Sequence, residues 1–214
     1  KYFDQYFPRF FKTYSEHWSL PIHVHIIDPT QNARYRLDRL PVTYTHCVTD
    51  KSVLKFPYSY ETYCQAQRFI LLGHKMLEEQ SVIVADVDSY ALRTPNDIQK
   101  QTLGSDMAFT QYNNRLMATF CNFHHSRRSH AKKAAVRMKE LIMNTDTIGV
   151  DQLVIKEVFK KFSYNNLPHR QWIRHHDVKT EIDKAMHNQC LIYHEKGTRG
   201  KGKGIKVEWT DIGL

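Results

Sequence analysis

The sequence predicts one α/β domain with a mostly parallel central sheet flanked by helices. Its 214 residues are enough to bury a substantial core, and 41% hydrophobic with 25% charged residues is an ordinary composition for a globular protein. The pattern favours a strand over 22–28, an amphipathic helix over 60–77 and a buried strand over 81–85, which is the strand–helix–strand order of parallel sheets. No internal repeat or domain boundary is visible, so we expect a single domain over 1–214 that ends in a flexible basic loop and tail over 195–214.

Aromatic residues at helical spacing predict a helix at the start of the chain. They run from Tyr2 to Trp18, with Pro8 close to the first turn, where proline is best tolerated. The strand over 22–28 follows, and a weaker strand is expected over 42–48, where large side chains alternate with smaller or polar ones. The amino-terminal part therefore supplies one helix and two strands ahead of the central helix.

The carboxyl-terminal half predicts further strands and two helices. Neighbouring strands are expected over 107–110 and 116–123, followed by a basic amphipathic helix over 129–143, a helix over 151–162 and a last strand over 191–193. The apolar stripe expected on the first of these helices is Ala131, Ala134, Ala135, Met138, Leu141 and Ile142, and on the second Leu153, Val154, Val158 and Phe162.

Charge and cysteine usage limit the class of partner. Lysine and arginine number 31 against 22 acidic residues, and the formal net charge of +9 favours nucleotides, phosphates, nucleic acids or acidic lipids without choosing among them. No run of about 18 apolar residues is present, so no membrane span is expected. Cys47, Cys64, Cys121 and Cys190 form no C-x-x-C pair, which favours reduced thiols and a cytoplasmic location. The chain begins with Lys1 rather than Met, which is consistent with a missing natural start.

Two carboxylates stand at the end of the strand over 81–85. Asp86 and Asp88 are one residue apart, and because alternate side chains of a strand point to the same side, the two can converge on one point. Converging carboxylates repel each other unless a cation lies between them, and Mg²⁺ or Mn²⁺ typically binds one or two carboxylates together with substrate phosphates. The pattern therefore favours a divalent-metal and diphosphate site over two solvated carboxylates in a turn.

The segment Asp86-Val87-Asp88 resembles the D-x-D metal motif of GT-A-fold glycosyltransferases, whose fold is Rossmann-like. Arg68 stands on the helix before this motif, where such enzymes often carry a basic residue near the nucleotide. Asp151-Gln152 is similar to the Asp-Gln pair near the donor sugar in glycogenin-like retaining enzymes. Tyr193–Gly197, followed by Lys201, resembles their H-x-x-G-x-x-K segment with one extra residue before the lysine.

The resemblance covers roughly Ile22 to Lys203, with the motifs in the family's order. Two features depart from the family pattern: the Pro-Trp pair that usually follows the final lysine is absent, and the customary first nucleotide-binding strand is not visible before Lys1. The resemblance thus implies either a truncated amino terminus or a minimal version of the fold, and it assigns no residue to the nucleotide base.

The resemblance implies a Mn²⁺- or Mg²⁺-dependent hexosyltransferase that moves a sugar from a nucleotide-diphosphate sugar, first of all a UDP-sugar, to a glycan, lipid or protein acceptor. It implies retention of the anomeric configuration, whereas an inverting enzyme would need a base, for which Asp151 is the best candidate. The candidate residues are Asp86, Asp88 and His194 for the metal; Arg68, Asp86, Asp106, Asn122, Lys196, Gly197 and Lys201 for the nucleotide and sugar; and Asp151 and Gln152 for catalysis.

Each candidate also has a plain structural interpretation. Asp151 suits a helix N-cap, Asn122 a turn, Asp106 a loop carboxylate and His194 a half-exposed strand end, while Lys196–Lys201 suits a disordered basic tail. The histidine clusters at 124–125 with 130, and at 175–176, lack the spacing of a zinc site and favour the surface.

Two other functions stay open. The first is a basic nucleic-acid-binding protein without catalysis, although the sequence has neither an aromatic-basic RNP pattern nor zinc-finger spacing. The second is a metal-dependent phosphohydrolase or nuclease, which usually needs more acidic ligands than this chain assembles. The residues that would bind nucleic acid are Arg127, Arg128, Lys132 and Lys133.

Overall fold

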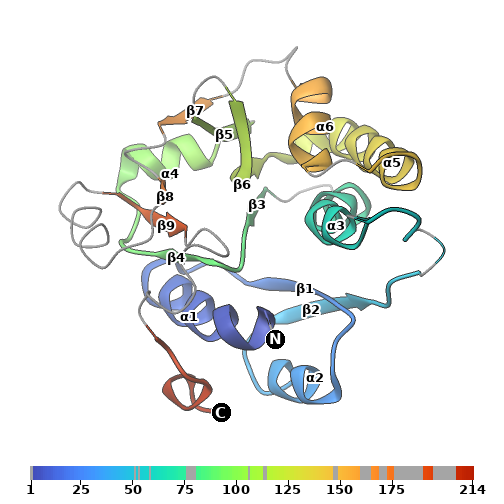
Figure 1. The fold of residues 1–214 in the computed structure, drawn as a ribbon. Coiled ribbons are helices and arrows are strands. Elements are labelled where there is room, and N and C mark those ends of the chain that lie inside the picture. Colours follow the sequence, from blue (N-terminus) through green and yellow to red (C-terminus); the bar gives the residue numbers. More distant parts are fainter. Residues whose placement is uncertain are drawn as a thin grey trace. The chain divides into compact units, whose positions relative to one another are not determined.

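The chain combines helices with short strands, so the predicted mixed α/β class is confirmed (Figure 1). The protein divides into two compact units: the first comprises Lys1–His46, Ala85–Gln99 and Pro168–Leu214, and the second Cys47–Val84 and Lys100–Leu167. The computed structural model describes residues 2–50, 52, 54–57, 59–75, 81–105, 107–112, 115–146, 149–159, 165–168, 173–175, 190–194 and 206–214.

The first unit contains the predicted opening helix and both early strands, and it adds a short helix that the sequence pattern did not predict. That helix begins after Thr30, whose side chain accepts a hydrogen bond from the backbone N–H of Ala33, as an N-cap does. The elements of the unit are α1 (Tyr2–His17), β1 (His23–Ile27), α2 (Gln31–Leu37), β2 (Thr43–Cys47), β4 (Ser89–Ala91), β8 (Ile173–His175), β9 (Ile192–His194) and the 3₁₀ turn η4 (Trp209–Ile212).

Aromatic side chains of α1 form the centre of this unit's larger core. The ring centres of Phe7 and Trp209 lie 5.9 Å apart, and those of Phe3 and Trp209 lie 5.4 Å apart. The turn η4 is therefore packed onto α1 through Trp209. The buried members of this core are Phe7, Phe11, Ile26, Ala33, Leu37, Leu40 and Trp209.

The second unit contains the predicted central helix, strand and carboxyl-terminal helices. Its elements are α3 (Ser59–Lys75), β3 (Val82–Ala85), α4 (Asp97–Leu103, shared with the first unit), β5 (Met107–Tyr112), β6 (Arg115–Phe123), the 3₁₀ turn η2 (His125–Arg127), α5 (Arg128–Asn144), α6 (Val150–Phe159) and β7 (Asn165–Pro168).

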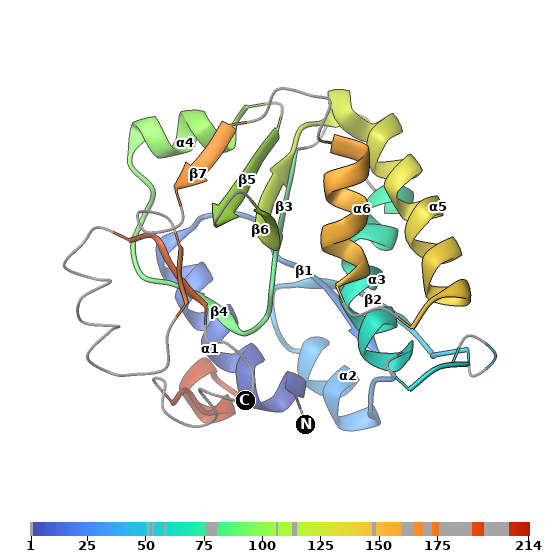
Figure 2. The ribbon, with the colours of Figure 1, turned by 45° about the horizontal axis from the view of Figure 1, so that its top comes forward.

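Helices α3, α5 and α6 lie side by side in this unit (Figure 2). Gly73 of α3 permits the close approach, because a Cβ atom added there would stand 2.6 Å from the Cβ of Ala135. The stripe predicted on α5 is confirmed, with Leu141 only partly buried. On α6 the prediction is confirmed for Val154, which is buried, and Val158 is partly buried, but it was wrong for Leu153, which is exposed. The helix also turns Val150 and Phe159 inward, and Phe162 lies outside the described residues.

The described strands form three small sheets, in the orders β1-β2, β3-β6-β5-β7 and β4-β9-β8. The predicted mostly parallel central sheet was wrong, because β5 pairs antiparallel with β6 and β4 pairs antiparallel with β9, whereas β8 pairs parallel with β9. Strands that lie only two residues apart in the sequence, such as β5 and β6, can only pair antiparallel, since a parallel connection needs a long crossover.

None of the helices in the described ranges combines the length and the apolar character that crossing a membrane requires. This finding agrees with the sequence, in which no apolar run is long enough for a span.

Candidate metal centre

A tight turn between β3 and β4 positions the two carboxylates of the D-x-D segment. The carbonyl oxygen of Asp86 accepts two hydrogen bonds from Ser89, one from its backbone N–H at 3.0 Å and one from its hydroxyl at 2.5 Å. These bonds fold residues 86–89 back on themselves. The side chains of Asp86 and Asp88 therefore extend from a hydrogen-bonded turn and not from a continuous strand.

Strand pairing brings the histidine to this turn. β9 runs antiparallel to β4, and His194 lies opposite Ser89 in the register. As a result His194 contacts Asp88, although 106 residues separate them in the chain. The sequence prediction that these three residues come together agrees with this geometry.

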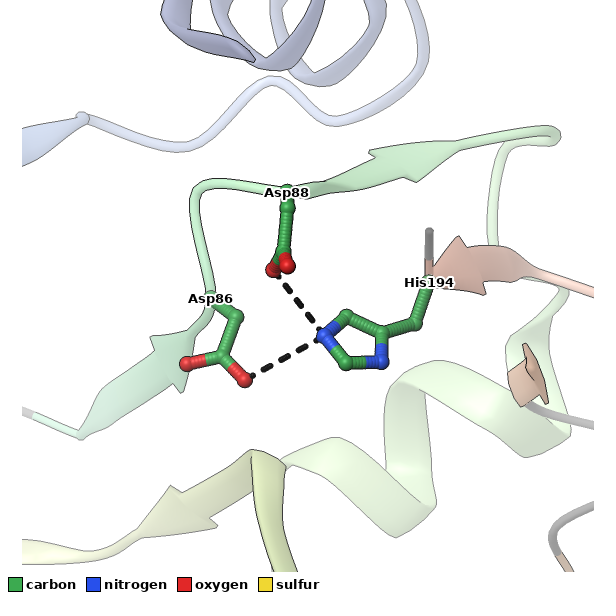
Figure 3. A group of neighbouring side chains, drawn as sticks. All are labelled: Asp86, Asp88 and His194. Carbon is green, nitrogen blue, oxygen red and sulfur yellow. Dashed lines mark hydrogen bonds and ion pairs between the residues drawn. The ribbon is translucent and has the colours of Figure 1, made fainter. Parts of the chain in front are cut away.

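The imidazole nitrogen Nε2 of His194 points between the two carboxylates (Figure 3). It lies 2.9 Å from Asp88 Oδ1 and 3.4 Å from Asp86 Oδ2, and the three candidate ligand atoms all lie within 4.8 Å of one another. The side chains of Asp88 and His194 are 8% and 9% exposed and that of Asp86 is 20% exposed, so the cluster is largely shielded from water.

Electrostatics keep Asp88 ionised in this setting. Burial acts to raise the pKa of the Asp88 carboxyl, but the hydrogen bond and positive charge of His194, with a further hydrogen bond from the Tyr2 side chain, lower that pKa below its usual value. An ionised carboxylate can only accept a hydrogen bond, so Nε2 of His194 carries the proton here and would have to lose it to ligate a metal.

The donor set suits a divalent metal. Two carboxylate oxygens and one imidazole nitrogen match Mn²⁺, and the oxygens alone match Mg²⁺. Ligation through Nε2 requires the neutral imidazole, with its proton on the other ring nitrogen. Three protein ligands would leave further coordination positions of either ion for water or phosphate oxygens. Within the described residues, this is the one cluster of three or more His, Cys, Asp or Glu side chains with metal-ligand spacing.

Three residues near the carboxylates were not predicted as site residues. Tyr2 hydrogen-bonds the carboxyl of Asp88, Ser89 closes the turn, and the hydroxyl of Tyr14 lies 3.2 Å from Ser89 Oγ. Of the three, Ser89 is the residue that the sequence could have indicated, because it directly follows the D-x-D motif. The contacts of Tyr2 and Tyr14 depend on how α1 packs, which no local pattern encodes.

Arg68 and Asp151 meet within the second unit. Arg68 Nη2 donates to Asp151 Oδ2 at 2.7 Å, and the other carboxylate oxygen accepts from the backbone N–H of Gln152 at 2.9 Å. Asp151 is buried in the first turn of α6, whereas Gln152 is exposed. Arg68, which was predicted to lie near the nucleotide, therefore forms an ion pair with Asp151, which was predicted to be catalytic. This ion pair connects α3 to α6.

Asn122 is buried in β6 of the same unit. Its amide nitrogen donates to the carbonyl oxygens of Leu103 and Ser105, at 2.8 and 3.0 Å. This amide therefore holds the loop between α4 and β5, and its contact with a sugar stays a prediction. Of the remaining candidates, Asp106, Lys196, Gly197 and Lys201 lie outside the described residues.

The predicted nucleic-acid-binding residues lie at the start of α5. Lys132 and Lys133 are exposed, and Arg127 and Arg128 are half-buried. His124 caps η2 by accepting a hydrogen bond from the backbone N–H of Ser126.

Comparison of this chain with protein-family models gives no match, and comparison with curated proteins gives none either.

Proposed function

We propose that this chain is a metal-dependent glycosyltransferase that uses a nucleotide-diphosphate sugar, with a UDP-sugar as the first donor to test. The observation that carries the proposal is the convergence of Asp86, Asp88 and His194, whose ligand atoms lie within 4.8 Å of one another. The D-x-D and H-x-x-G segments supply these three residues, which are the ones that the family resemblance assigns to the metal.

The local order of elements supports a GT-A-like assignment. Helix α3 leads into β3, and the two carboxylates follow that strand at once. In a GT-A-like enzyme this order places the metal motif at the end of a strand. The proposal concerns this core of the fold, with sheets that are small and mostly antiparallel in this chain.

The chemistry proposed for the centre is stabilisation of a leaving diphosphate. Mn²⁺ or Mg²⁺, when bound, supplies a Lewis acid that neutralises charge on the phosphate oxygens. Asp86 and Asp88 contribute the anionic ligands, and His194 contributes a neutral nitrogen. Lys196 and Lys201, which follow β9 in the sequence, are proposed to add positive charge at the departing diphosphate.

The contacts of Asp151 favour retention over inversion. Both of its carboxylate oxygens are engaged, one by Arg68 and one by the N–H of Gln152. An inverting enzyme needs a general base with an oxygen that can accept the proton of its acceptor hydroxyl, and both oxygens of Asp151 already accept hydrogen bonds within the second unit. We therefore propose a retaining reaction, for which no strong base is required; a contact of Asp151 and Gln152 with the donor sugar stays a prediction of the family resemblance.

The four cysteines support a reducing location. Cys47, Cys64, Cys121 and Cys190 form no disulfide with one another. Cysteines outside disulfides are usual where glutathione keeps thiols reduced, so we propose that the enzyme works in the cytoplasm.

The test is a donor panel assayed with and without Mn²⁺. UDP-glucose, UDP-galactose, UDP-N-acetylglucosamine and GDP-mannose are incubated with the protein, and release of the nucleoside diphosphate is measured. The proposal predicts Mn²⁺-dependent release from at least one donor, lost in Asp88→Asn and kept in Asp97→Asn, an exposed aspartate outside the cluster. Parallel arms with a phosphodiester and with single-stranded RNA identify a hydrolase or a nucleic-acid-binding protein. Activity or binding in those arms alone would refute the glycosyltransferase.

A further inference from the structure

One face of α1 lies along β4, the strand that follows the carboxylate turn (Figure 1). Three side chains of this face, together with Trp18 directly after the helix, contact four residues at or just after the turn. Arg9 lies 4.3 Å from the ring centre of Tyr90, Thr13 Oγ1 accepts from Ala91 N at 3.1 Å, Tyr14 OH lies 3.2 Å from Ser89 Oγ, and Trp18 Nε1 donates to Arg93 O at 3.1 Å.

The hydrogen bond between Tyr14 and Ser89 has a definite direction. Ser89 has one hydroxyl proton, and it donates that proton to the carbonyl oxygen of Asp86 at 2.5 Å. The Tyr14 hydroxyl must then be the donor to Ser89 Oγ. Burial raises the pKa of Tyr14, although the Ser89 hydrogen bond opposes this, so the phenol keeps its proton. The result is an ordered chain from Tyr14 to Ser89 to Asp86.

Ser89 contacts or adjoins each of the three candidate ligands. It bonds the backbone of Asp86, it follows Asp88 in the sequence, and it lies opposite His194 in the β4–β9 pairing. Ser89 is fully buried and Tyr14 is nearly so. A change in the position of Ser89 would therefore move all three ligands relative to one another.

We propose that Tyr14 and Ser89 are positioning residues of the metal centre: Tyr14 holds the Ser89 hydroxyl, and Ser89 holds the Asp86 carbonyl so that Asp86, Asp88 and His194 keep their spacing. This inference rests on the proposed function, because it assumes that the three side chains bind a metal. Neither residue ligates the metal itself. Removal of such outer partners typically lowers metal affinity by about 10- to 100-fold.

The test is the Mn²⁺ dissociation constant of Tyr14→Phe, Ser89→Ala and the double variant, measured by titration calorimetry. We expect about a tenfold loss in Tyr14→Phe and a larger loss in Ser89→Ala. Because Tyr14 acts through Ser89, the double variant should bind no more weakly than Ser89→Ala alone. The matched control is Tyr44→Phe, which removes a hydroxyl of the same unit that donates to Asp38 Oδ1 at 2.6 Å.

A purely structural role would change the midpoint of thermal unfolding without changing Mn²⁺ affinity, so both are measured on each variant. If Ser89→Ala does not fold, Tyr14→Phe and Tyr44→Phe still decide the question. Wild-type affinity in Tyr14→Phe, together with lost binding in Asp88→Asn, would overturn the positioning role and leave the metal centre intact. Undiminished Mn²⁺ binding in Asp88→Asn would overturn the centre and this inference with it.

Discussion

Arg68 and Asp151 form a largely buried ion pair that joins α3 to α6, with Nη2 and Oδ2 2.7 Å apart and the side chains 23% and 4% exposed. Asp151 lies in the first turn of α6, where a negative charge is also favoured by the helix dipole. The pair therefore neutralises a carboxylate that would otherwise be buried with a backbone hydrogen bond but no positive charge beside it.

Removal of Arg68 should destabilise the protein more than removal of a surface arginine. Arg68→Met leaves Asp151 buried without its cation, and we expect a loss of about 3 kcal/mol in the free energy of unfolding. Arg137→Met is the control, since Arg137 bonds Glu140 at 3.2 Å with both side chains well exposed, and it should cost less than about 1 kcal/mol. Urea denaturation of both variants measures the difference, and equal losses would contradict a buried pair.

Gly73→Ala should destabilise the contact between α3 and α5. Alanine favours a helix by about 1 kcal/mol over glycine, but its Cβ would stand 2.6 Å from Ala135 Cβ and 2.7 Å from Ala131 O. Overpacking of this kind costs about 1 to 3 kcal/mol, so the steric term should win and the midpoint of thermal unfolding should fall.

Two variants test that explanation. Gly104→Ala places its Cβ in ordinary contact, 3.4 Å from Lys100 O, and should leave the midpoint nearly unchanged. Gly73→Ala combined with Ala135→Gly should recover part of the loss, because the nearest side-chain atom is then gone. A midpoint for Gly73→Ala at or above that of the wild type would show that the helices separate without cost.

His25 should make the protein less stable in mild acid. Burial lowers the pKa of His25, and the positive charges of His23 and His46 lower it further. The folded state therefore binds this proton less readily than the unfolded chain, whose histidine has a pKa of about 6.5. The contribution of His25 is fully present above that value, and stability is lost as the pH falls through it.

The measurement is the free energy of unfolding at pH 7.5 and at pH 5.5 for the wild type and for His25→Gln. We expect the free energy of unfolding to fall less between these two pH values in His25→Gln than in the wild type. The control is His125→Gln, which changes an exposed histidine in η2. An unchanged drop in His25→Gln would assign the acid sensitivity to other groups.

Local sequence pattern predicted most of the helices and strands, although not α2 or α4, and it predicted the three residues of the candidate metal centre. The apolar run before Asp86 gave its strand, and the two carboxylates with His194 gave the cluster that the structure assembles. Helical spacing gave the buried stripe of α5, but it misplaced Leu153 because several phases fit a short helix with many apolar residues.

The pairing of residues and strands that are distant in the sequence could not be predicted from local pattern. Strand partners are set by contacts between distant segments. No local rule predicts that β4 pairs with β9, or that the described strands form three small sheets and not the single central sheet expected. The same holds for the bond from Tyr14 to Ser89, across 75 residues, and for Arg68 with Asp151, across 83.

The central claim is that Asp86, Asp88 and His194 bind a divalent metal, and titration calorimetry of the purified protein with Mn²⁺ tests it most directly. We predict one saturable site in the wild type, affinity at least about tenfold weaker in His194→Ala, and no measurable binding in Asp88→Asn. Asp97→Asn should match the wild type. Equal Mn²⁺ affinity in the wild type, Asp88→Asn and His194→Ala, or no binding in any of them, would contradict the claim.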